Sequence, residues 1–270
     1  MKPSAEPPSA EPGARPTPIG SGALSEDTLL NGRIRLRQHL RGYRVAIDPV
    51  LLAAAVPARA GESVLDLGCG VGAAGLCLLS RCPACDVVGL EREAALVELA
   101  RGNAALNGFS ERFSVVTGDV TARPLPAAVQ GRDHVMCNPP FLEADSGTTS
   151  PEPGNEGAKR EDSARLDDWI EAALSAVRPK GSLTFVHRAD RLEALLAGLH
   201  GRAGEIVVYP LWPQPPGDDK ARPAKRVLVR ARKAVAGPTR LASGLVLHDR
   251  DGAFTPAAQA VLREAAGLSL

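Results

Sequence analysis

The residues Asn138, Pro139, Pro140 and Phe141 follow directly on the apolar run "HVMC". Both prolines fix φ and lack a backbone N–H, and a residue before proline is held out of the helical region. The turn is therefore stiff and rich in acceptors, with an aromatic ring beside them. Such a turn suits a planar group that carries an NH2. A proline-rich β-turn that merely closes a strand explains these four residues equally well.

A glycine-rich turn follows another apolar run, in "SVLDLGCGVGAAG". Gly68, Gly70 and Gly72 remove side chains where a strand leads into a helix, so that a ligand can lie against bare backbone. Glu91 ends the next run 19 residues after Gly72, where a carboxylate can accept both hydroxyls of a ribose. The glycines alone are weak evidence, because Gly70, Gly72 and Gly75 also satisfy the G-x-G-x-x-G pattern of dinucleotide sites.

Further acidic residues favour one of these two ligands. Asp66, two residues before the first glycine, would face a pyrophosphate with like charge, but it suits a cationic amino group and a sulfonium. Asp119 in "TGDV" closes the third run, where an acceptor can bind an adenine N6 amine. Carboxylates at three strand ends, with Asn138 at the fourth, favour S-adenosylmethionine over NAD as the cofactor.

The elements that must position these residues alternate along the chain as strands and helices. This pattern predicts an α/β, Rossmann-like fold: a seven-stranded, mostly parallel sheet with helices on both faces and small N- and C-terminal extensions. Ligands in such folds bind beyond the carboxyl ends of the strands. The expected strands are 63–68, 86–91, 113–119, 134–138, 182–187, 205–209 and 225–231, and the helices between them include 93–107, 167–177 and 190–199.

Four regions are expected along the chain. Residues 1–22, with six prolines, form a disordered tail, and 23–57 form an N-terminal cap with a basic strand and a short helix. Residues 58–235 form the core, and 236–270 form a hairpin followed by a helix. Asp48 is expected as N-cap of the short helix with Pro49 in its first turn, and Thr255 with Pro256 as the cap of the last helix.

A polar segment at 143–165 follows the Asn-Pro-Pro-Phe turn directly. A mobile lid over the pocket and a simply disordered loop are equally compatible with its composition.

The charge balance bounds the partners of the chain. Its 32 Lys and Arg against 31 Asp and Glu leave almost no net charge, so a nucleic acid would have to meet local basic patches. Two runs offer them, because alternation on a strand places part of each run on one face, as phosphate contacts require. The first run has no acidic residue among its arginines. The candidate RNA-binding residues are Arg33, Arg35, Arg37, Arg41, Arg44, Lys225, Arg226 and Arg230.

Other features argue for a cytoplasmic protein. The longest aliphatic run, Val50 to Val56, is far shorter than the ~20 residues of a membrane helix. The N-terminus has no apolar stretch of the kind found in signal peptides.

Five cysteines without an export signal indicate free thiols, and "CPAC" at 82–85 is interpreted as structural, with no metal site. We expect a monomer or a weak dimer.

These motifs together resemble class I methyltransferases that act on planar amide or amine nitrogens. More narrowly, the chain resembles the bacterial tRNA1(Val) (adenine-37-N6)-methyltransferase family over about residues 24–265. The segment "AKRE" at 158–161 departs from the family pattern, in which a histidine often stands. The segments that carry the narrower resemblance are "RLRQHLRGYRVAIDPVLLAAAVP", "RGNAALNG", "HVMCNPPF", "HRADRLEALL", "AKRVLVRARK" and "GLVLHDRDGAFTPAAQAVL".

The resemblance implies an S-adenosylmethionine-dependent enzyme that methylates N6 of an unpaired adenine of tRNA, at anticodon-loop position 37. It implies that Asn138 and the Pro139 carbonyl accept from the target amine, that Pro140 stiffens the turn, and that Phe141 stacks on the base. The cofactor-binding residues implied in this way are Asp66, Gly68, Gly70, Gly72, Glu91, Asp119, Asn138 and, in an N-terminal element over the cofactor, Gln38 and Asp48.

Alternative functions share the same motif. A protein glutamine N5-methyltransferase carries it too, but usually with a helical N-terminal domain for which this chain has little room. An rRNA adenine or guanine N-methyltransferase also fits the motif. A DNA adenine methyltransferase would need a target-recognition region, and a non-catalytic binding module would have no use for an intact Asn-Pro-Pro-Phe.

Overall fold

The computed structural model describes the chain except for residues 1–22, 42–43, 141, 144–159, 162–163 and 217–221. The expected N-terminal tail, Phe141 and most of the 143–165 segment therefore lie outside the described residues.

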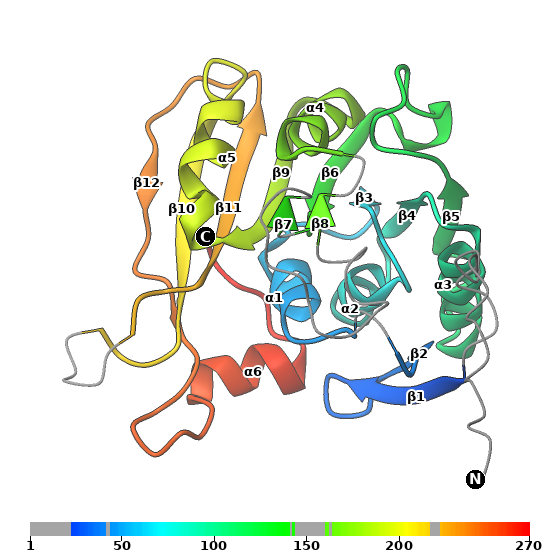
Figure 1. The fold of residues 1–270 in the computed structure, drawn as a ribbon, viewed down its shortest axis with the longest axis horizontal. Coiled ribbons are helices and arrows are strands. Elements are labelled where there is room, and N and C mark those ends of the chain that lie inside the picture. Colours follow the sequence, from blue (N-terminus) through cyan, green and yellow to red (C-terminus); the bar gives the residue numbers. More distant parts are fainter. Residues whose placement is uncertain (1–22, 42–43, 141, 144–159, 162–163, 217–221) are drawn as a thin grey trace, which may run out of the picture.

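A nine-stranded sheet forms the centre of the fold (Figure 1). Its order is β12-β10-β11-β9-β6-β3-β4-β5, with β13 beside β10, and β11 alone runs antiparallel to its neighbours. The seven longer strands are the predicted ones, so the α/β Rossmann-like fold is confirmed, and two short strands extend one edge. The sheet strands are β3 (Ser63–Leu67), β4 (Asp86–Glu91), β5 (Phe113–Thr117), β6 (Arg132–Cys137), β9 (Val177–Arg188), β10 (Ala203–Trp212), β11 (Arg226–Lys233), β12 (Arg240–Leu241) and β13 (Leu245–Val246).

Helices cover both faces of the sheet and create two apolar cores. One core contains α1, α2, α3 and α6, and the other contains η1, α4 and α5. Successive strand residues face opposite cores, as Val64 and Leu65 of β3 do. Because both faces of such a strand are buried, its sequence is a continuous apolar run. The helices are α1 (Asp48–Ala55), α2 (Ala73–Arg81), α3 (Ala94–Leu106), η1 (Ala127–Val129), α4 (Leu166–Ala176), η2 (Ala189–Arg191), α5 (Leu192–Leu199) and α6 (Pro256–Glu264).

An N-terminal hairpin packs beside α2 and α3. It is formed by β1 (Leu24–Leu29) and β2 (Ile34–His39), and a separate parallel pair joins β7 (Leu142–Glu143) to β8 (Arg160–Glu161). Two asparagine side chains of α3 form hydrogen bonds with the backbone of β2, as a neighbouring strand would. The Asn103 amide donates to the Arg37 carbonyl and accepts from its N–H, at 2.9 and 2.8 Å, and Asn107 does the same for Arg35 at 2.7 and 2.9 Å.

The two helix caps predicted from sequence have different outcomes. Thr255 caps α6 as predicted, because its Oγ1 accepts from the N–H of Ala258 at 3.1 Å. The prediction for Asp48 was wrong: the N-cap position of α1 is Ile47, and the Asp48 side chain makes no capping hydrogen bond. Its carboxylate instead pairs with Arg226 of β11 at 3.1 Å, a partner that is distant in sequence.

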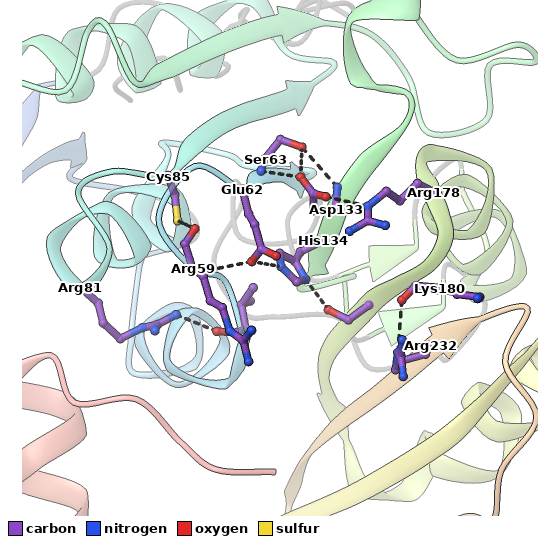
Figure 2. A network of polar contacts seen from close by, with 12 residues as sticks. Arg59, Glu62, Ser63, Arg81, Cys85, Asp133, His134, Arg178, Lys180 and Arg232 are labelled. Atoms are coloured by element: carbon purple, nitrogen blue, oxygen red, sulfur yellow. Dashed lines mark hydrogen bonds and ion pairs between the residues drawn. The ribbon is translucent and has the colours of Figure 1, made fainter.

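The five cysteines are free thiols, as the sequence predicts. Cys85 is buried, and its Sγ lies 3.0 Å from the carbonyl oxygen of Arg59, which accepts its hydrogen bond (Figure 2).

A polar network ties the amino ends of β3, β6 and β9 together (Figure 2). Asp133 of β6 accepts from both the N–H and the hydroxyl of Ser63, each at 2.8 Å, and from Arg178 Nε at 2.6 Å. The neighbouring His134 contacts Glu62 at 2.9 Å. Burial by itself would raise the pKa of Asp133, but these hydrogen bonds and the charge of Arg178 outweigh it and lower the pKa to about 2.

The lowered pKa of Asp133 predicts a pH-dependent contribution to stability. The ionised carboxylate stabilises the fold above its unfolded pKa of 3.8, and this stabilisation is lost as the pH falls towards about 2. We expect Asp133→Asn to reduce the free energy of unfolding by roughly 1 kcal/mol at pH 7. Urea titrations should show that the difference in free energy of unfolding between Asp133→Asn and the unaltered protein is smaller near pH 3 than near pH 7.

Asp86→Asn is the matched control. Asp86 pairs with Arg112 at 3.0 Å, but both side chains are about half exposed, so its loss should change stability by at most a few tenths of a kcal/mol. A deficit for Asp133→Asn that is as large near pH 3 as near pH 7 would contradict the role of its charge.

Candidate functional site

A cavity of about 320 Å³ lies at the carboxyl ends of the parallel strands. Leu67 of β3 pairs with Leu90 of β4 on one side and with Cys137 of β6 on the other, so the residues that follow these strands meet at one edge. This is the position that the alternating pattern predicts. The sequence-predicted residues that line the cavity are Gln38, Arg41, Asp66, Gly68, Gly70, Glu91, Asp119, Asn138, Pro139 and Pro140.

Two predicted cofactor residues do not line the cavity. Asp48 is engaged with Arg226. Gly72 precedes α2 with φ of 87°, and a Cβ on it would lie 2.8 Å from the ring of Phe113. The structure therefore explains this glycine by its left-handed backbone and by close packing.

Two buried carboxylates form one wall of the cavity. Asp66 is 3% exposed and accepts from the N–H of Gly75 at 3.0 Å. Burial raises the pKa of Asp66 to about 7 against the effect of this hydrogen bond, and the charge of Glu91 adds to the rise. Glu91, which is 8% exposed, accepts from the N–H groups of Gly70 and Glu93 at 2.9 Å each. Burial raises the pKa of Glu91 as well, so a cationic ligand would stabilise both ionised forms.

Asp119 lies two residues beyond the end of β5, which closes at Thr117. Its Oδ1 accepts from the N–H and the hydroxyl of Thr121, both at 2.8 Å. These hydrogen bonds outweigh burial and lower the pKa of Asp119. An ionised carboxylate therefore faces the cavity, where it can accept a hydrogen bond from an amine.

Asn138 follows β6 directly and is one of the residues that line the cavity. Its Oδ1 is buried and has no hydrogen-bond partner among the described residues. The two prolines that follow cannot donate to it, because they lack an N–H. A buried oxygen without a donor is costly, so this position is suited to a ligand that brings an N–H group.

Gln38 lines the cavity, and hydrogen bonds hold both ends of its side-chain amide. Its amide donates to Asp27 at 2.9 Å and accepts from the N–H of Val45 at 2.9 Å. The side chain is 3% exposed, so it fixes the chain that leads from β2 to α1 next to the cavity.

Sequence reasoning missed Trp169 and His39, which also line the cavity. Trp169 belongs to the first turn of α4, and a Cβ on Gly68 would lie 2.5 Å from its indole ring. The glycine is therefore required by the close approach of the indole. A tryptophan in the first turn of a helix that precedes a parallel strand could have been noticed, because such helices begin at the carboxyl edge of the sheet.

The alternation predicted for the first basic run is confirmed: Arg33, Arg35 and Arg37 are exposed, and the residues between them are buried. The assumption that no acidic residue stands among these arginines does not hold in three dimensions, because β1 supplies two. Glu26 pairs with Arg35 at 2.6 Å and with Arg37 at 3.1 Å. In the same way, Asp27 pairs with Arg44 at 2.9 Å.

The second basic run is largely engaged within the protein. Arg226 pairs with Asp48, and the Arg230 guanidinium donates to the Leu270 carbonyl. Burial lowers the pKa of Arg230, and the nearby Arg240 adds to this effect. Lys225 is exposed. Phosphate contacts by Arg226 and Arg230 would therefore have to compete with existing partners.

Comparisons with known proteins agree with this architecture. Residues 44–203 match the model of a family described as methyltransferase small domain. A tRNA1(Val) (adenine(37)-N6)-methyltransferase of Porphyromonas gingivalis is 34% identical over 158 residues, which cover 56% of this chain and 61% of that protein. A ribosomal RNA large subunit methyltransferase G of Pseudoalteromonas translucida is 39% identical over 89 residues, covering 32% of this chain and 22% of that protein.

A solved structure shares most of the fold. The crystal structure of a predicted O-methyltransferase from Agrobacterium tumefaciens superposes with a TM-score of 0.66 at 28% identity, covering 83% of this chain and 99% of that chain. These matches confirm the resemblance drawn from the sequence motifs. The chain spans only about 61% of the length of the Porphyromonas relative.

Within the described part of the chain, no helix has the length and apolar character needed to cross a membrane.

The raised pKa of Asp66 predicts pH-dependent binding of a cationic ligand. S-adenosylhomocysteine carries a cationic amino group, and a protonated Asp66 must release its proton to pair with it. We expect its association constant to fall below pH 7, by up to about tenfold per pH unit. Isothermal titration calorimetry between pH 5 and pH 8 measures this profile, with NAD as the competing ligand.

Asp66→Asn distinguishes the contribution of Asp66 to the pH dependence from that of the neighbouring Glu91. This variant should bind more weakly at pH 8 and show a flatter profile, because the titrating group is removed. Equal affinity of the unaltered protein for S-adenosylhomocysteine across this pH range, or binding of NAD alone, would contradict the assignment.

Proposed function

The chain belongs to the methyltransferase small domain family, and we propose that it transfers the methyl group of S-adenosylmethionine to N6 of an unpaired adenine in tRNA. The observation that carries this proposal is the buried Oδ1 of Asn138, an acceptor without a donor at the cavity wall. The N6 amine of adenine supplies the missing donor.

Three carboxylates support the choice of cofactor. Asp66, which is buried and lines the cavity from β3, suits the cationic methionine end. We assign Glu91 to the ribose hydroxyls, and Asp119, which follows the neighbouring strand β5, to the adenine amine. A cavity of about 320 Å³ is of the size that small-molecule cofactors occupy.

The protein's part in the reaction is to hold and align the amine. When bound, S-adenosylmethionine supplies an electrophilic methyl group on sulfonium. The N6 lone pair is shared with the adenine ring, so the amine is a poor nucleophile. Asn138 Oδ1 and the Pro139 carbonyl would accept from its two hydrogens and orient the lone pair towards the methyl carbon. As positive charge develops on nitrogen, both hydrogen bonds strengthen, which lowers the barrier. The prolines keep these acceptors rigid and place no N–H opposite the amine.

RNA is the substrate class that the surface favours. The exposed face of β2 carries Arg35 and Arg37, Arg33 directly precedes this strand, and Arg41 lies at the cavity itself. Glu26 and Asp27 reduce this positive charge without cancelling it. An unpaired base is also the least costly one to bring into a pocket. The Porphyromonas relative is named for a tRNA adenine at position 37, which makes that position our proposal here.

Ribosomal RNA is the second candidate substrate. It is supported by the 39% identity to the Pseudoalteromonas enzyme, which covers only 32% of this chain. Mass spectrometry of nucleosides from separated tRNA and rRNA, taken from cells with and without the protein, distinguishes the two. Loss of N6-methyladenosine from tRNA supports the proposal, and loss from rRNA alone contradicts it.

Asn138→Ala tests the proposed mechanism. Loss of an acceptor that strengthens in the transition state should lower turnover by about 10²–10³-fold, by analogy with an oxyanion-hole donor. Affinity for S-adenosylhomocysteine and melting temperature should change little, because Oδ1 makes no hydrogen bond within the described protein. Single-turnover methylation of unmodified tRNA measures the first effect, and calorimetry the others.

Asn107→Ala is the matched control for Asn138→Ala. Asn107 bonds the backbone of Arg35 far from the cavity, so its removal should lower stability and leave the turnover of the folded fraction intact. Near-normal turnover in Asn138→Ala would rule out the proposed role of the amide.

The arginines of β2 predict a salt-dependent affinity for RNA. Each phosphate contact contributes roughly 0.7–0.9 to the slope of log affinity against log salt concentration. Replacing Arg33, Arg35 and Arg37 together by Gln should therefore flatten the slope by about 2–3 without changing cofactor affinity. Filter binding of tRNA over a range of salt concentrations measures the slope.

Arg232→Gln is the control for these arginines. Arg232 is partly exposed and pairs with Glu205 at 2.9 Å, as Arg35 pairs with Glu26, but it lies on β11 away from the hairpin. The slope should be unaltered in this variant. An unaltered slope in the triple variant would remove the hairpin from the RNA interface.

A further inference from the structure

Asn103 of α3 holds two chain segments that are far apart in sequence. Its amide nitrogen donates to the Arg37 carbonyl of β2 and to the Val71 carbonyl of the glycine loop (residues 68–72), both at 2.9 Å. Its amide oxygen accepts from the N–H of Arg37 at 2.8 Å. The side chain is fully buried, so water does not compete for these three hydrogen bonds.

Both segments that Asn103 holds belong to walls of the cavity. On the loop side, Val71 itself lines the cavity. On the hairpin side, Arg37 directly precedes Gln38 and His39, which also line it. The spacing of these two walls is therefore set in part by one buried amide.

The neighbours of Asn103 on α3 contact the same two segments. Ala100, one helical turn earlier, packs against the loop, because a Cβ on Gly72 would lie 3.4 Å from its Cβ. Asn107, one turn later, bonds the Arg35 backbone of β2 at 2.7 and 2.9 Å. One face of α3 thus rests on the loop at one end and on β2 at the other, and Asn103 stands where the two contacts meet.

The strand that Asn103 holds also carries arginines proposed to contact RNA. Arg35 and Arg37 are exposed on β2. A cofactor in the cavity would restrict the motion of the glycine loop, and the hydrogen bonds of Asn103 would extend this restriction to β2. RNA would then bind a strand that has already lost part of its conformational freedom, so that binding costs less entropy. Each ligand would raise the affinity for the other by the same factor.

We propose that Asn103 is a positioning residue that makes the binding of cofactor and RNA cooperative, by joining the glycine loop to β2. This inference rests on the proposed function and adds a regulation to it: RNA is held tightly chiefly when the cofactor site is filled. It also gives a role to the motif "RGNAALNG" at residues 101–108, which contains Asn103 and Asn107.

Asn103→Ala tests the coupling. Alanine favours the helix, so α3 is kept while the hydrogen bonds to Arg37 and Val71 are removed. Filter binding measures the dissociation constant of an unmodified valine tRNA transcript without and with saturating S-adenosylhomocysteine, which has no methyl group to transfer. In the unaltered protein S-adenosylhomocysteine should tighten RNA binding by about fivefold or more, a usual size for coupling between sites. In Asn103→Ala this factor should fall to about twofold or less.

Asn107→Ala is the matched control. Asn107 bonds the backbone of β2 as Asn103 does, but it has no hydrogen bond to the glycine loop among the described residues. Its removal should weaken the hairpin and keep the full coupling factor. Asn103→Ser is the second variant should Asn103→Ala fail to fold, because a single hydroxyl donor cannot serve both carbonyls.

Hydrogen exchange measures the connection without RNA. S-adenosylhomocysteine alone should slow the amide exchange of residues 33–37 in the unaltered protein and in Asn107→Ala, but not in Asn103→Ala.

The failing outcomes are distinct. An unaltered protein without coupling, equal coupling in the Asn103 variants, or an equal loss of coupling in Asn107→Ala would each overturn the role of Asn103. An unaltered protein that binds S-adenosylhomocysteine but no RNA contradicts the proposed function instead. Hydrogen exchange then still decides whether Asn103 joins the loop to β2, because slowing that persists in Asn103→Ala overturns it.

Discussion

The parallel pairing of β3 with β4 and β6 is the constraint on which the site depends. It brings the ends of separate chain segments to one edge, so that Asp66, Glu91 and Asn138 meet although they are far apart in sequence. The pairing leaves the glycine loop between them with little freedom. At its start, Gly68 donates to the Leu90 carbonyl at 2.8 Å, which joins the loop to the end of the adjacent strand. The site is thus a consequence of sheet register, and the loops only complete it.

Burial of carboxylates gives this edge its electrostatic character. Asp66 and Glu91 are held by backbone N–H groups of the loop they border, yet desolvation still raises the pKa of both. Burial therefore makes negative charge in the cavity unfavourable, and a cationic ligand would offset this cost. At the opposite edge, Asp133 has an arginine partner, and hydrogen bonds lower its pKa. The pKa values of Asp66 and Asp133 are thus shifted in opposite directions, because Asp66 has no cationic partner among the described residues and Asp133 has one.

A single buried side chain connects the basic hairpin to the glycine loop. Asn103 of α3 donates both to the Arg37 carbonyl of β2 and to the Val71 carbonyl, each at 2.9 Å. It is fully buried, so neither contact competes with water. The surface proposed for RNA and the loop proposed for the cofactor therefore share one anchor. Movement of one would be expected to affect the other.

By itself, the sequence determined the strands, their buried faces and the residues that close them, because alternation and strand ends are local properties. It therefore also indicated Asp66, Glu91 and Asn138. Pairing between distant segments could not be seen in it. Only the tertiary structure decided that Asp48 pairs with Arg226, that the acidic residues of β1 neutralise part of the arginine run, and that Trp169 lies over Gly68. Each of these depends on which elements pack together, and local pattern carries no information on that.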